Sequence, residues 1–326
     1  MIAARAHSGP VCSVLPRSRR AAWAGGVASA ISYGVTPIVA VTAFADGVQP
    51  SVLVTLRSLV GAAAIFALCA VTRRLRPIPR RAAVGLVAVC GPLFGAQILA
   101  YFAALERTGA QMAVVVAHIY PIFVIALVSL TTRRPVPRQV LTLCVILTSG
   151  IVLVAGTGTG HRSGIGIALA VVSAAGYAIY FVCGERWVHQ AGTVAATGLV
   201  SFGSAISIGV VALVTDANFA LNAVGWSAVA LQGLLLIPIG IGGALYAIRR
   251  LGSVPMSLLG LLEPVVAIVL AAIFLDESLS VFQWVGVSIV LAACTTLPWA
   301  TRDARRNAAS ARPGCPRTQR PRDHPS

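Results

Sequence analysis

The chain has 326 residues, of which 57% are hydrophobic and only 10% are charged, with a mean hydropathy of +0.87. Soluble domains carry about 25% charged residues, so this composition excludes a water-soluble globular protein and predicts an integral membrane protein. All 25 basic residues are Arg, which gives a net charge of +16. The lack of Lys excludes an ATPase site built on a P-loop.

Ten apolar runs follow one another along the chain, each close to the ~20 residues that cross a bilayer as a helix. We therefore predict an all-α integral membrane protein with ten transmembrane helices. A basic N-tail, residues 1–21, precedes them, and a basic, disordered C-tail, residues 300–326, follows them. The predicted spans are residues 22–44, 51–71, 83–104, 110–130, 140–156, 164–184, 194–214, 225–247, 254–275 and 281–299.

The distribution of Arg predicts the orientation of the chain. Twenty-two of the 25 Arg lie in the two tails and in the loops on one side, whereas the loops on the other side contain only Arg107 and Arg162. By the positive-inside rule, both termini are cytoplasmic and the protein lies in the cell membrane. The Arg-rich tails are candidate contacts for acidic lipids. Nucleic acid is not an expected partner, because the C-tail has no aromatic residue for base stacking.

The first charge inside a predicted span is Arg57, six residues into the second span. Its long side chain either snorkels to the headgroups or pairs with an acidic group or a substrate carboxylate, and the sequence leaves both readings open. Tyrosines also fall inside spans, where they either pack with a local hydrogen bond or line a cavity. They are Tyr33, Tyr101, Tyr120, Tyr177 and Tyr180.

The two halves of the membrane region resemble each other. An offset of 143 residues places Gly109 on Gly252, and upstream SAISYG at 29–34 matches SAAGYA at 173–178 at an offset of 144. The first repeat covers residues 22–156 and the second covers residues 164–299. Five spans is an odd number, so the second copy crosses the membrane in the opposite direction. Inverted five-helix repeats are typical of secondary transporters, with the substrate bound near the midplane between the repeats.

The same offset pairs Tyr120-Pro121 with Glu263-Pro264, each in the middle of a span. A proline removes one backbone donor, so Pro121 and Pro264 are predicted to break their helices and to free the carbonyl four residues earlier. Broken backbone at this depth is tolerated only when it is buried in protein or lines a cavity. We therefore predict two matched breaks around a midplane cavity.

Glu263 is the acidic residue within this pair of motifs, about 13 Å deep in the hydrocarbon core. A charge there costs at least about 2.5 kcal/mol, so its side chain must face the bundle interior. It either functions in coupling or recognition, or hydrogen-bonds a neighbouring helix and fixes the packing. On a continuous helix His118 lies about 200° from Tyr120, so these two side chains are not both expected to face one cavity.

The stretch LLEPVVAIVLAAIFLDESLSVFQWVGVSIVLAA, which contains Glu263, Glu277 and Gly286, resembles the EamA family of the drug/metabolite transporter superfamily. LRSLVGAAAIF, at Arg57, resembles the Arg-containing second helix of that family. The resemblance covers about residues 20–299. It implies ten helices in two inverted repeats and the export of small metabolites, by exchange or driven by gradients. One departure is Arg133-Arg134-Pro135, where the family usually has an acidic residue.

We therefore predict a secondary transporter that exports a small metabolite, such as an amino acid or an amphipathic compound, by alternating access. An intramembrane lipid-modifying enzyme and a non-catalytic membrane scaffold are the alternatives. The enzyme would need a nucleophile, base or metal cluster at depth, and the sequence shows no such motif, so we expect no enzymatic activity, cofactor or metal. Substrate, direction, coupling ion and oligomeric state stay open. The hypothesised cavity residues are Tyr33, Arg57, Tyr120, Tyr177 and Glu263, with Glu263 as the hypothesised proton-coupling group.

Overall fold

The computed structural model describes residues 16–72, 77–108, 110–133, 136–155, 163–274 and 280–310. These residues are almost entirely helical, and no strand occurs among them. Two short segments, η1 and η2, are π-helical. The elements in chain order are α1 (Pro16–Ala45), α2 (Pro50–Val71), α3 (Arg80–Gly85), η1 (Leu86–Cys90), α4 (Gly91–Thr108), α5 (Ala110–Ala117), α6 (Tyr120–Thr132), α7 (Arg138–Ala155), α8 (Gly164–Ala191), α9 (Thr193–Val214), α10 (Ala223–Leu231), η2 (Gln232–Leu236), α11 (Ile237–Leu251), α12 (Ser253–Leu259), α13 (Leu262–Phe274) and α14 (Val281–Ser310).

The helices have the length and the surface of a multi-pass membrane protein. Among the described residues, nine helices are long and apolar enough to cross a membrane, and a further apolar helix, Arg138–Val154, is shorter. The ten-span count itself therefore stays a prediction. Large apolar side chains lie on the outside, with Val71, Val214 and Val281 each more than three-quarters exposed. Such a surface is expected to face lipid rather than water.

Helical structure extends into both predicted tails. α1 begins at Pro16, and α14 continues to Ser310, so residues 300–310 are helical where the sequence predicted disorder. Ala and Arg are strong helix formers, and this Arg- and Ala-rich segment therefore continues the helix after the apolar stretch has ended. Residues 1–15 and 311–326 of the tails, and Glu277 of the acidic boundary, lie outside the described residues.

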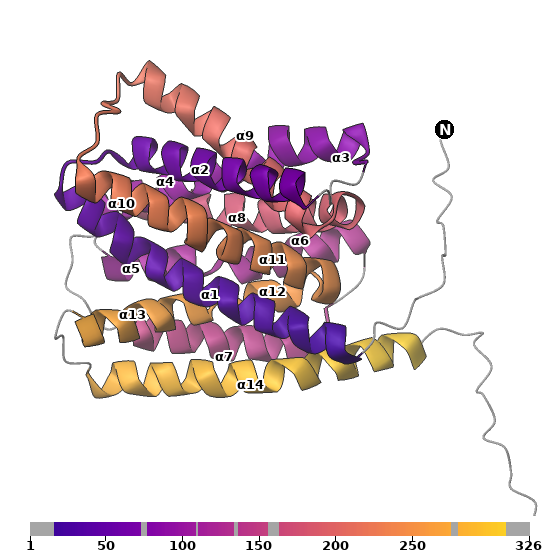
Figure 1. Ribbon diagram of the computed structural model, residues 1–326. Coiled ribbons are helices and arrows are strands. Elements are labelled where there is room, and N and C mark those ends of the chain that lie inside the picture. The colour runs from indigo at the N-terminus through magenta and orange to yellow at the C-terminus, as the bar shows by residue number, and fades with distance from the viewer. Residues whose placement is uncertain are drawn as a thin grey trace, which may run out of the picture.

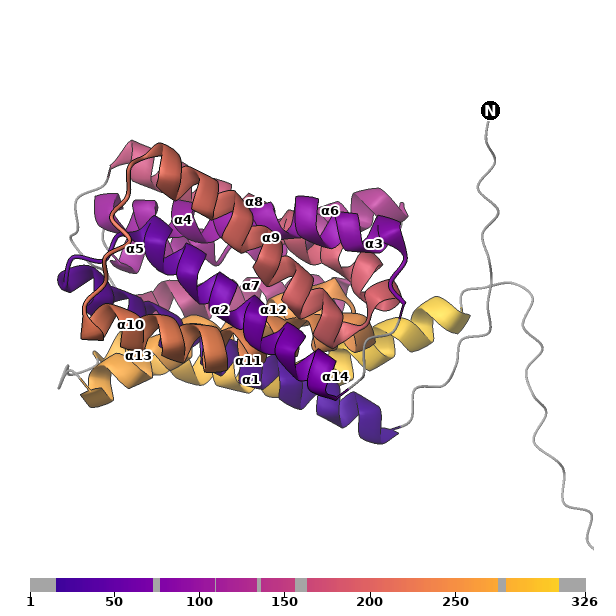
Figure 2. The ribbon, with the colours of Figure 1, turned by 45° about the horizontal axis from the view of Figure 1, so that its top comes forward.

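The two halves pack with the symmetry that an inverted repeat requires. The most extensive helix pairings are α2 with α9, α7 with α14, α4 with α8 and α1 with α11. In the repeat, α1, α2, α4 and α7 of the first half correspond to α8, α9, α11 and α14 of the second. The α2–α9 and α7–α14 pairings are therefore each symmetric, and the α1–α11 pairing is equivalent to the α8–α4 pairing. The start of α1 and the end of α14 lie at the same end of the bundle (Figures 1 and 2). We call this the terminal end, and the other the loop end.

Close backbone approach and serine hydroxyls hold neighbouring helices of the two halves together. A Cβ on Gly203 of α9 would lie 2.1 Å from the carbonyl oxygen of Val87 in η1, so only glycine fits there. From α1, Ser29 donates to the Gly240 carbonyl of α11 and Ser32 donates to the Leu236 carbonyl of η2, each at 2.7 Å. Small residues and interhelical hydrogen bonds are the usual means of helix association in lipid.

Each half contains one π-helical segment at an equivalent place. The Gly91 N–H donates to the Leu86 carbonyl five residues earlier, and the residue after η2 donates to Gln232 in the same way. A proline stands two residues after the end of each segment, Pro92 in the first half and Pro238 in the second. A proline lacks the N–H and its ring crowds the carbonyl four residues earlier, and the wider π turn accommodates this.

Candidate functional site

The chain leaves the helix just before each of the two mid-span prolines. His118 and Ile119 separate α5 from α6, and Gly260 and Leu261 separate α12 from α13. We predicted that Pro264 leaves the Gly260 carbonyl without a hydrogen bond, and this prediction is wrong. The Gly260 carbonyl accepts the N–H of Glu263 at 2.9 Å. The backbone tightens into an i→i+3 turn there, which satisfies the carbonyl that the proline leaves.

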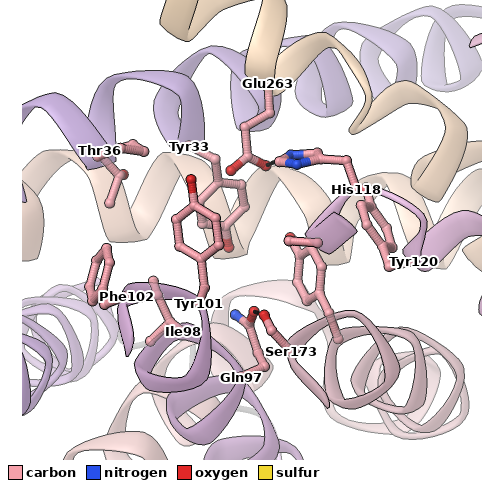
Figure 3. A pocket seen from close by; sticks show the side chains of 13 residues that line it. Tyr33, Thr36, Gln97, Ile98, Tyr101, Phe102, His118, Tyr120, Ser173 and Glu263 are labelled. Atoms are coloured by element: carbon pink, nitrogen blue, oxygen red, sulfur yellow. Dashed lines mark hydrogen bonds and ion pairs between the residues drawn. The ribbon is translucent and has the colours of Figure 1, made fainter. Parts of the chain in front are cut away.

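A cavity lies beside these breaks, between the halves (Figure 3). Its residues from α1 and from the continuous helix α3–η1–α4 (Arg80–Thr108) lie past the middle of these helices, which lead away from the terminal end. The cavity is therefore displaced toward the loop end. The cavity has a volume of about 50 Å³, which is room for a few water molecules. The lining residues are Tyr33, Thr36, Pro37, Gln97, Ile98, Tyr101, Phe102, Ala117, His118, Tyr120, Ser173, Tyr177 and Glu263.

Four of the five side chains proposed from the sequence lie together at this cavity, namely Tyr33, Tyr120, Tyr177 and Glu263. Tyr33 and Tyr177 are partners in the internal repeat, and they approach the same space from α1 and α8. The Tyr120 and Tyr177 rings are 4.7 Å apart between centroids. The Tyr120 hydroxyl donates to the Ser257 carbonyl of α12 at 2.9 Å. Tyr120 thus ties the broken helix of one half to that of the other.

The fifth residue, Arg57, does not line the cavity. Its side chain is only 2% exposed, so it does not snorkel, and its Nη1 donates to Oε1 of Gln232 at 2.6 Å. Gln232 is the first residue of η2, which brings its side chain to α2. Arg57 Nε and Gln232 Nε2 have no hydrogen-bond partner among the described residues. The guanidinium is therefore held between two helices of opposite halves, next to the site rather than in it.

His118 lines the cavity together with Tyr120, and their ring centroids are 6.2 Å apart. The expectation that these two side chains point in different directions is wrong. It assumed a continuous helix with 100° per residue, whereas the helix breaks between the two residues. The irregular backbone at His118 and Ile119 turns both rings toward the same space.

Glu263 and His118 are the ionisable pair of the site. The His118 Nε2 atom lies 3.9 Å from the Glu263 Oε2 atom, and the side chains are 8% and 20% exposed, respectively. The other imidazole nitrogen, Nδ1, lies 2.8 Å from the Val114 carbonyl of α5. Figure 3 shows both side chains on one side of the cavity, with the ring of Tyr101 pointing toward the carboxylate.

Two polar residues that the sequence analysis did not single out complete the lining. Ser173 of α8 donates to Oε1 of Gln97 of α4 at 3.3 Å, on the side of the cavity away from Glu263 (Figure 3). Each is a polar residue within an apolar run, and this pattern could have identified it in the sequence as a candidate lining residue. The cavity thus has a carboxylate and an imidazole on one side, an amide and a hydroxyl on the other, and tyrosine rings between them.

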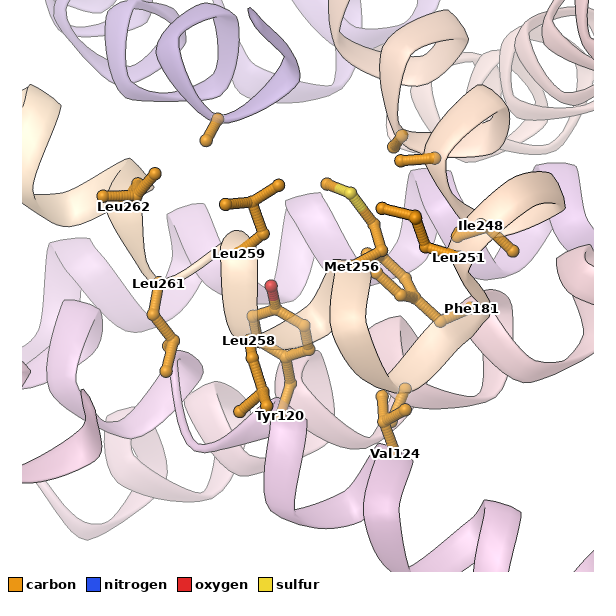
Figure 4. Close-up of a cluster of buried hydrophobic side chains, with 14 of the residues drawn as sticks. Tyr120, Val124, Phe181, Ile248, Leu251, Met256, Leu258, Leu259, Leu261 and Leu262 are labelled. Atoms are coloured by element: carbon orange, nitrogen blue, oxygen red, sulfur yellow. The ribbon is translucent and has the colours of Figure 1, made fainter. Parts of the chain in front are cut away.

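Tightly packed apolar side chains close the bundle between the cavity and the terminal end. Phe181 of α8 and Met256 of α12 are almost completely buried there, beside the inner face of Tyr120. Leu251 and Leu259 fill the space around them (Figure 4). The cavity is therefore separated from the terminal end by a layer of core.

One carboxylate reinforces this closed end. Glu185 Oε2, on the terminal half of α8, accepts the backbone N–H of Ser253 at 2.8 Å and also its hydroxyl. Ser253 is the first residue of α12, so the bonds fix the start of the broken helix. The repeat partners at the loop end are Val41 and Ala110, which provide neither a carboxylate nor a hydroxyl. The latch therefore exists at one end only.

Comparison with known proteins supports the architecture. The sequence profile of the EamA-like transporter family matches residues 21–156 and 164–297, one match for each half. A solved crystal structure of a protein with 18% sequence identity is similar in fold, with a TM-score of 0.72, over 87% of this chain and 99% of that chain. No curated protein matches the sequence significantly.

Proposed function

The chain belongs to the EamA-like transporter family, and from this premise we propose that it exports a small metabolite across the cell membrane by alternating access. An amino acid or an amphipathic compound is the expected cargo. The observation that carries the proposal is the polar cavity between two inverted halves, which core side chains separate from the terminal end. Members of this family are generally transporters, and we assign this chain no enzymatic activity.

The inverted repeat explains why such a cavity serves transport. Two halves of similar structure and opposite direction give two conformations of similar free energy, in which the cavity faces one side or the other. The Arg distribution puts the terminal end in the cytoplasm. On that orientation the cavity lies toward the outer side of the bundle, and the Glu185 latch lies at the cytoplasmic end.

The lining favours a cargo with both an apolar body and polar ends. Tyr33, Tyr101 and Tyr177 supply rings for stacking, whereas Glu263 and Gln97 supply polar contacts on opposite sides. The cavity volume of about 50 Å³ is small. A metabolite can therefore bind only when the surrounding helices move apart. This structure therefore corresponds to a nearly closed state of the cycle. The Arg-rich tails are proposed to contact acidic lipids.

Flux measurements with purified protein in proteoliposomes test this function. We expect saturable flux of at least one amino acid or amphipathic metabolite, with a rate that depends on an imposed pH gradient. Glu263→Gln should change that pH dependence, whereas Glu106→Gln, which changes an exposed carboxylate of α4, should not. Absence of saturable flux across a broad screen would count against transport. An unchanged pH profile in Glu263→Gln would remove Glu263 from coupling.

A further inference from the structure

The geometry of His118 and Glu263 defines a site for one proton. A carbonyl oxygen only accepts hydrogen bonds, so His118 Nδ1, 2.8 Å from the Val114 carbonyl, carries hydrogen. In the neutral imidazole, the lone pair of Nε2 then faces Glu263 Oε2 at 3.9 Å. Two acceptors facing each other in a poorly solvated place repel, so the pair takes up a proton or needs another cation beside it.

The two helix breaks favour charges of opposite sign at these positions. His118 follows the last residue of α5, and Glu263 is in the first turn of α13. A helix C-terminus stabilises a cation, and a helix N-terminus stabilises an anion. The end of α5 thus stabilises a positive charge at His118, and the start of α13 stabilises a negative charge at Glu263.

No second cation among the described residues lines the cavity. The groups that face Glu263 from the neighbouring elements are His118 and the phenols of α1, α4, α6 and α8, namely Tyr33, Tyr101, Tyr120 and Tyr177. Arg57 of α2 acts electrostatically on Tyr33 but is held by Gln232 outside the lining. On α7 and α14, which also pack on α13, Cys144 and Cys294 lie near Tyr120. Tyrosine rings beside a carboxylate are a surface that recognises organic cations.

We propose that the cavity binds an organic amine in its ammonium form, with Glu263 as its counter-ion and with His118 giving up a proton in exchange. The proposal deepens the transport function and rests on it for the direction of movement. The tyrosine rings contact the carbon body and the cationic end of the ligand. Gln97 and Ser173 accept or donate a hydrogen bond at its far end.

Charge balance explains the exchange. A net charge in a poorly solvated cavity is costly, so the carboxylate of Glu263 is neutralised by one cation at a time. Without ligand this is the imidazolium of His118, formed when Nε2 takes a proton from the solvent. When an ammonium group binds beside Glu263, the imidazolium is repelled by it and returns its proton to the solvent. One ammonium group thus replaces one proton, which is the stoichiometry of an amine/proton exchanger.

Equilibrium binding to the purified full-length protein in detergent tests the amine site without any need for transport. Three probes share one aromatic body and differ in charge: tyramine is a cation, tyrosol is neutral and 4-hydroxyphenylacetate is an anion. We expect tyramine to bind at least about tenfold more tightly than either of the others, as a hydrogen bond to a charged group implies. Equal affinity for tyrosol, tighter binding of the anion or absence of binding by all three would overturn the proposal.

Two variants with matched controls assign the roles. Glu263→Gln should abolish the preference for tyramine over tyrosol, whereas Glu106→Gln, at an exposed site on α4, should retain it. Calorimetry in buffers of different ionisation heat, repeated over a range of pH, should detect proton release when tyramine binds. His118→Asn, which retains a donor toward the Val114 carbonyl, should abolish this release. His189→Asn, at an exposed site of α8, should not.

These outcomes separate the proposal from the transport function. A preference for tyramine that persists in Glu263→Gln, or proton release that persists in His118→Asn, would refute the assigned roles. Saturable flux of an anionic or neutral solute, combined with failure of tyramine to bind, would leave the transport function in place and overturn the amine site alone. Tyramine binding without flux of any solute would leave the amine site in place and overturn the transport function.

Discussion

The latch between Glu185 and Ser253 offers the most direct test of which end of the bundle is closed. Glu185→Ala removes a carboxylate that accepts two hydrogen bonds from the first residue of α12. The repeat partners at the loop end lack this interaction. The substitution should therefore destabilise the present conformation relative to one that is open at the terminal end, and should not destabilise both conformations equally.

The size of the effect follows from the two bonds. A hydrogen bond to a charged group contributes about 1.5–3 kcal/mol. The Glu185 side chain is only half-buried, so we assign the pair of bonds together about 2 kcal/mol rather than the sum. Because each 1.4 kcal/mol is a factor of ten, the population of the conformation open at the terminal end should rise about 30-fold.

Alkylation of an introduced thiol measures this population. Ser257 of α12 is completely buried between the cavity and the terminal end, and Ser257→Cys is nearly isosteric. In a background without the native cysteines, this thiol reacts with a polar maleimide only when the terminal end opens. The alkylation rate should rise about 30-fold in Glu185→Ala, because the rate follows the open population when opening is fast compared with alkylation.

A matched carboxylate provides the control. Glu106→Ala removes an exposed side chain of α4 at the loop end, whose ion pair with Arg107 is as long as 4.0 Å. It should leave the alkylation rate unchanged. Equal rates in Glu185→Ala and the parent, or an equal rise in Glu106→Ala, would refute the assignment of Glu185 as a latch of the terminal end.

Two further predictions concern stability. Gly203→Ala should lower the free energy of unfolding by about 1–3 kcal/mol, because its Cβ would lie 2.1 Å from the Val87 carbonyl oxygen. Thermal unfolding in detergent measures the loss, and Gly164→Ala, whose Cβ meets nothing within 4 Å, should show none. Gln232→Leu should cost about 1–3 kcal/mol by leaving the buried Arg57 guanidinium without its acceptor. Adding Arg57→Met should recover most of that loss, and strictly additive losses in the double-mutant cycle would contradict this.

The internal repeat in the sequence predicted structural features that occur at equivalent positions in both halves. It paired the prolines at 121 and 264, and the chain leaves the helix before each of them. The two π-helical segments were missed, although Pro92 and Pro238 stand at equivalent places and were a readable signal. A π turn depends on how the helix accommodates a proline, and proline alone permits a kink, a break or a π turn.

Side-chain direction was the part that the sequence did not predict. A continuous helix put His118 and Tyr120 on different faces, but the break turns both toward one cavity. Arg57 had two open readings, at the headgroups or at an acidic group. It instead donates to Gln232, a neutral residue 175 positions away. The partner of a buried polar group depends on which helices meet, and residue spacing along one helix does not specify that.

Composition and pattern by themselves determined that this chain is a multi-pass, all-helical membrane protein with a duplicated interior. Hydropathy determines which segments insert into the membrane, and the offset between the copies determines which helices are equivalent. The tertiary structure alone decided where the duplication is unequal. It brought His118 of one copy against Glu263 of the other, and it placed the Glu185 latch at one end of the bundle only. Electrostatic interactions act over a few ångströms in space, and residues more than a hundred positions apart come that close only when the two copies pack together.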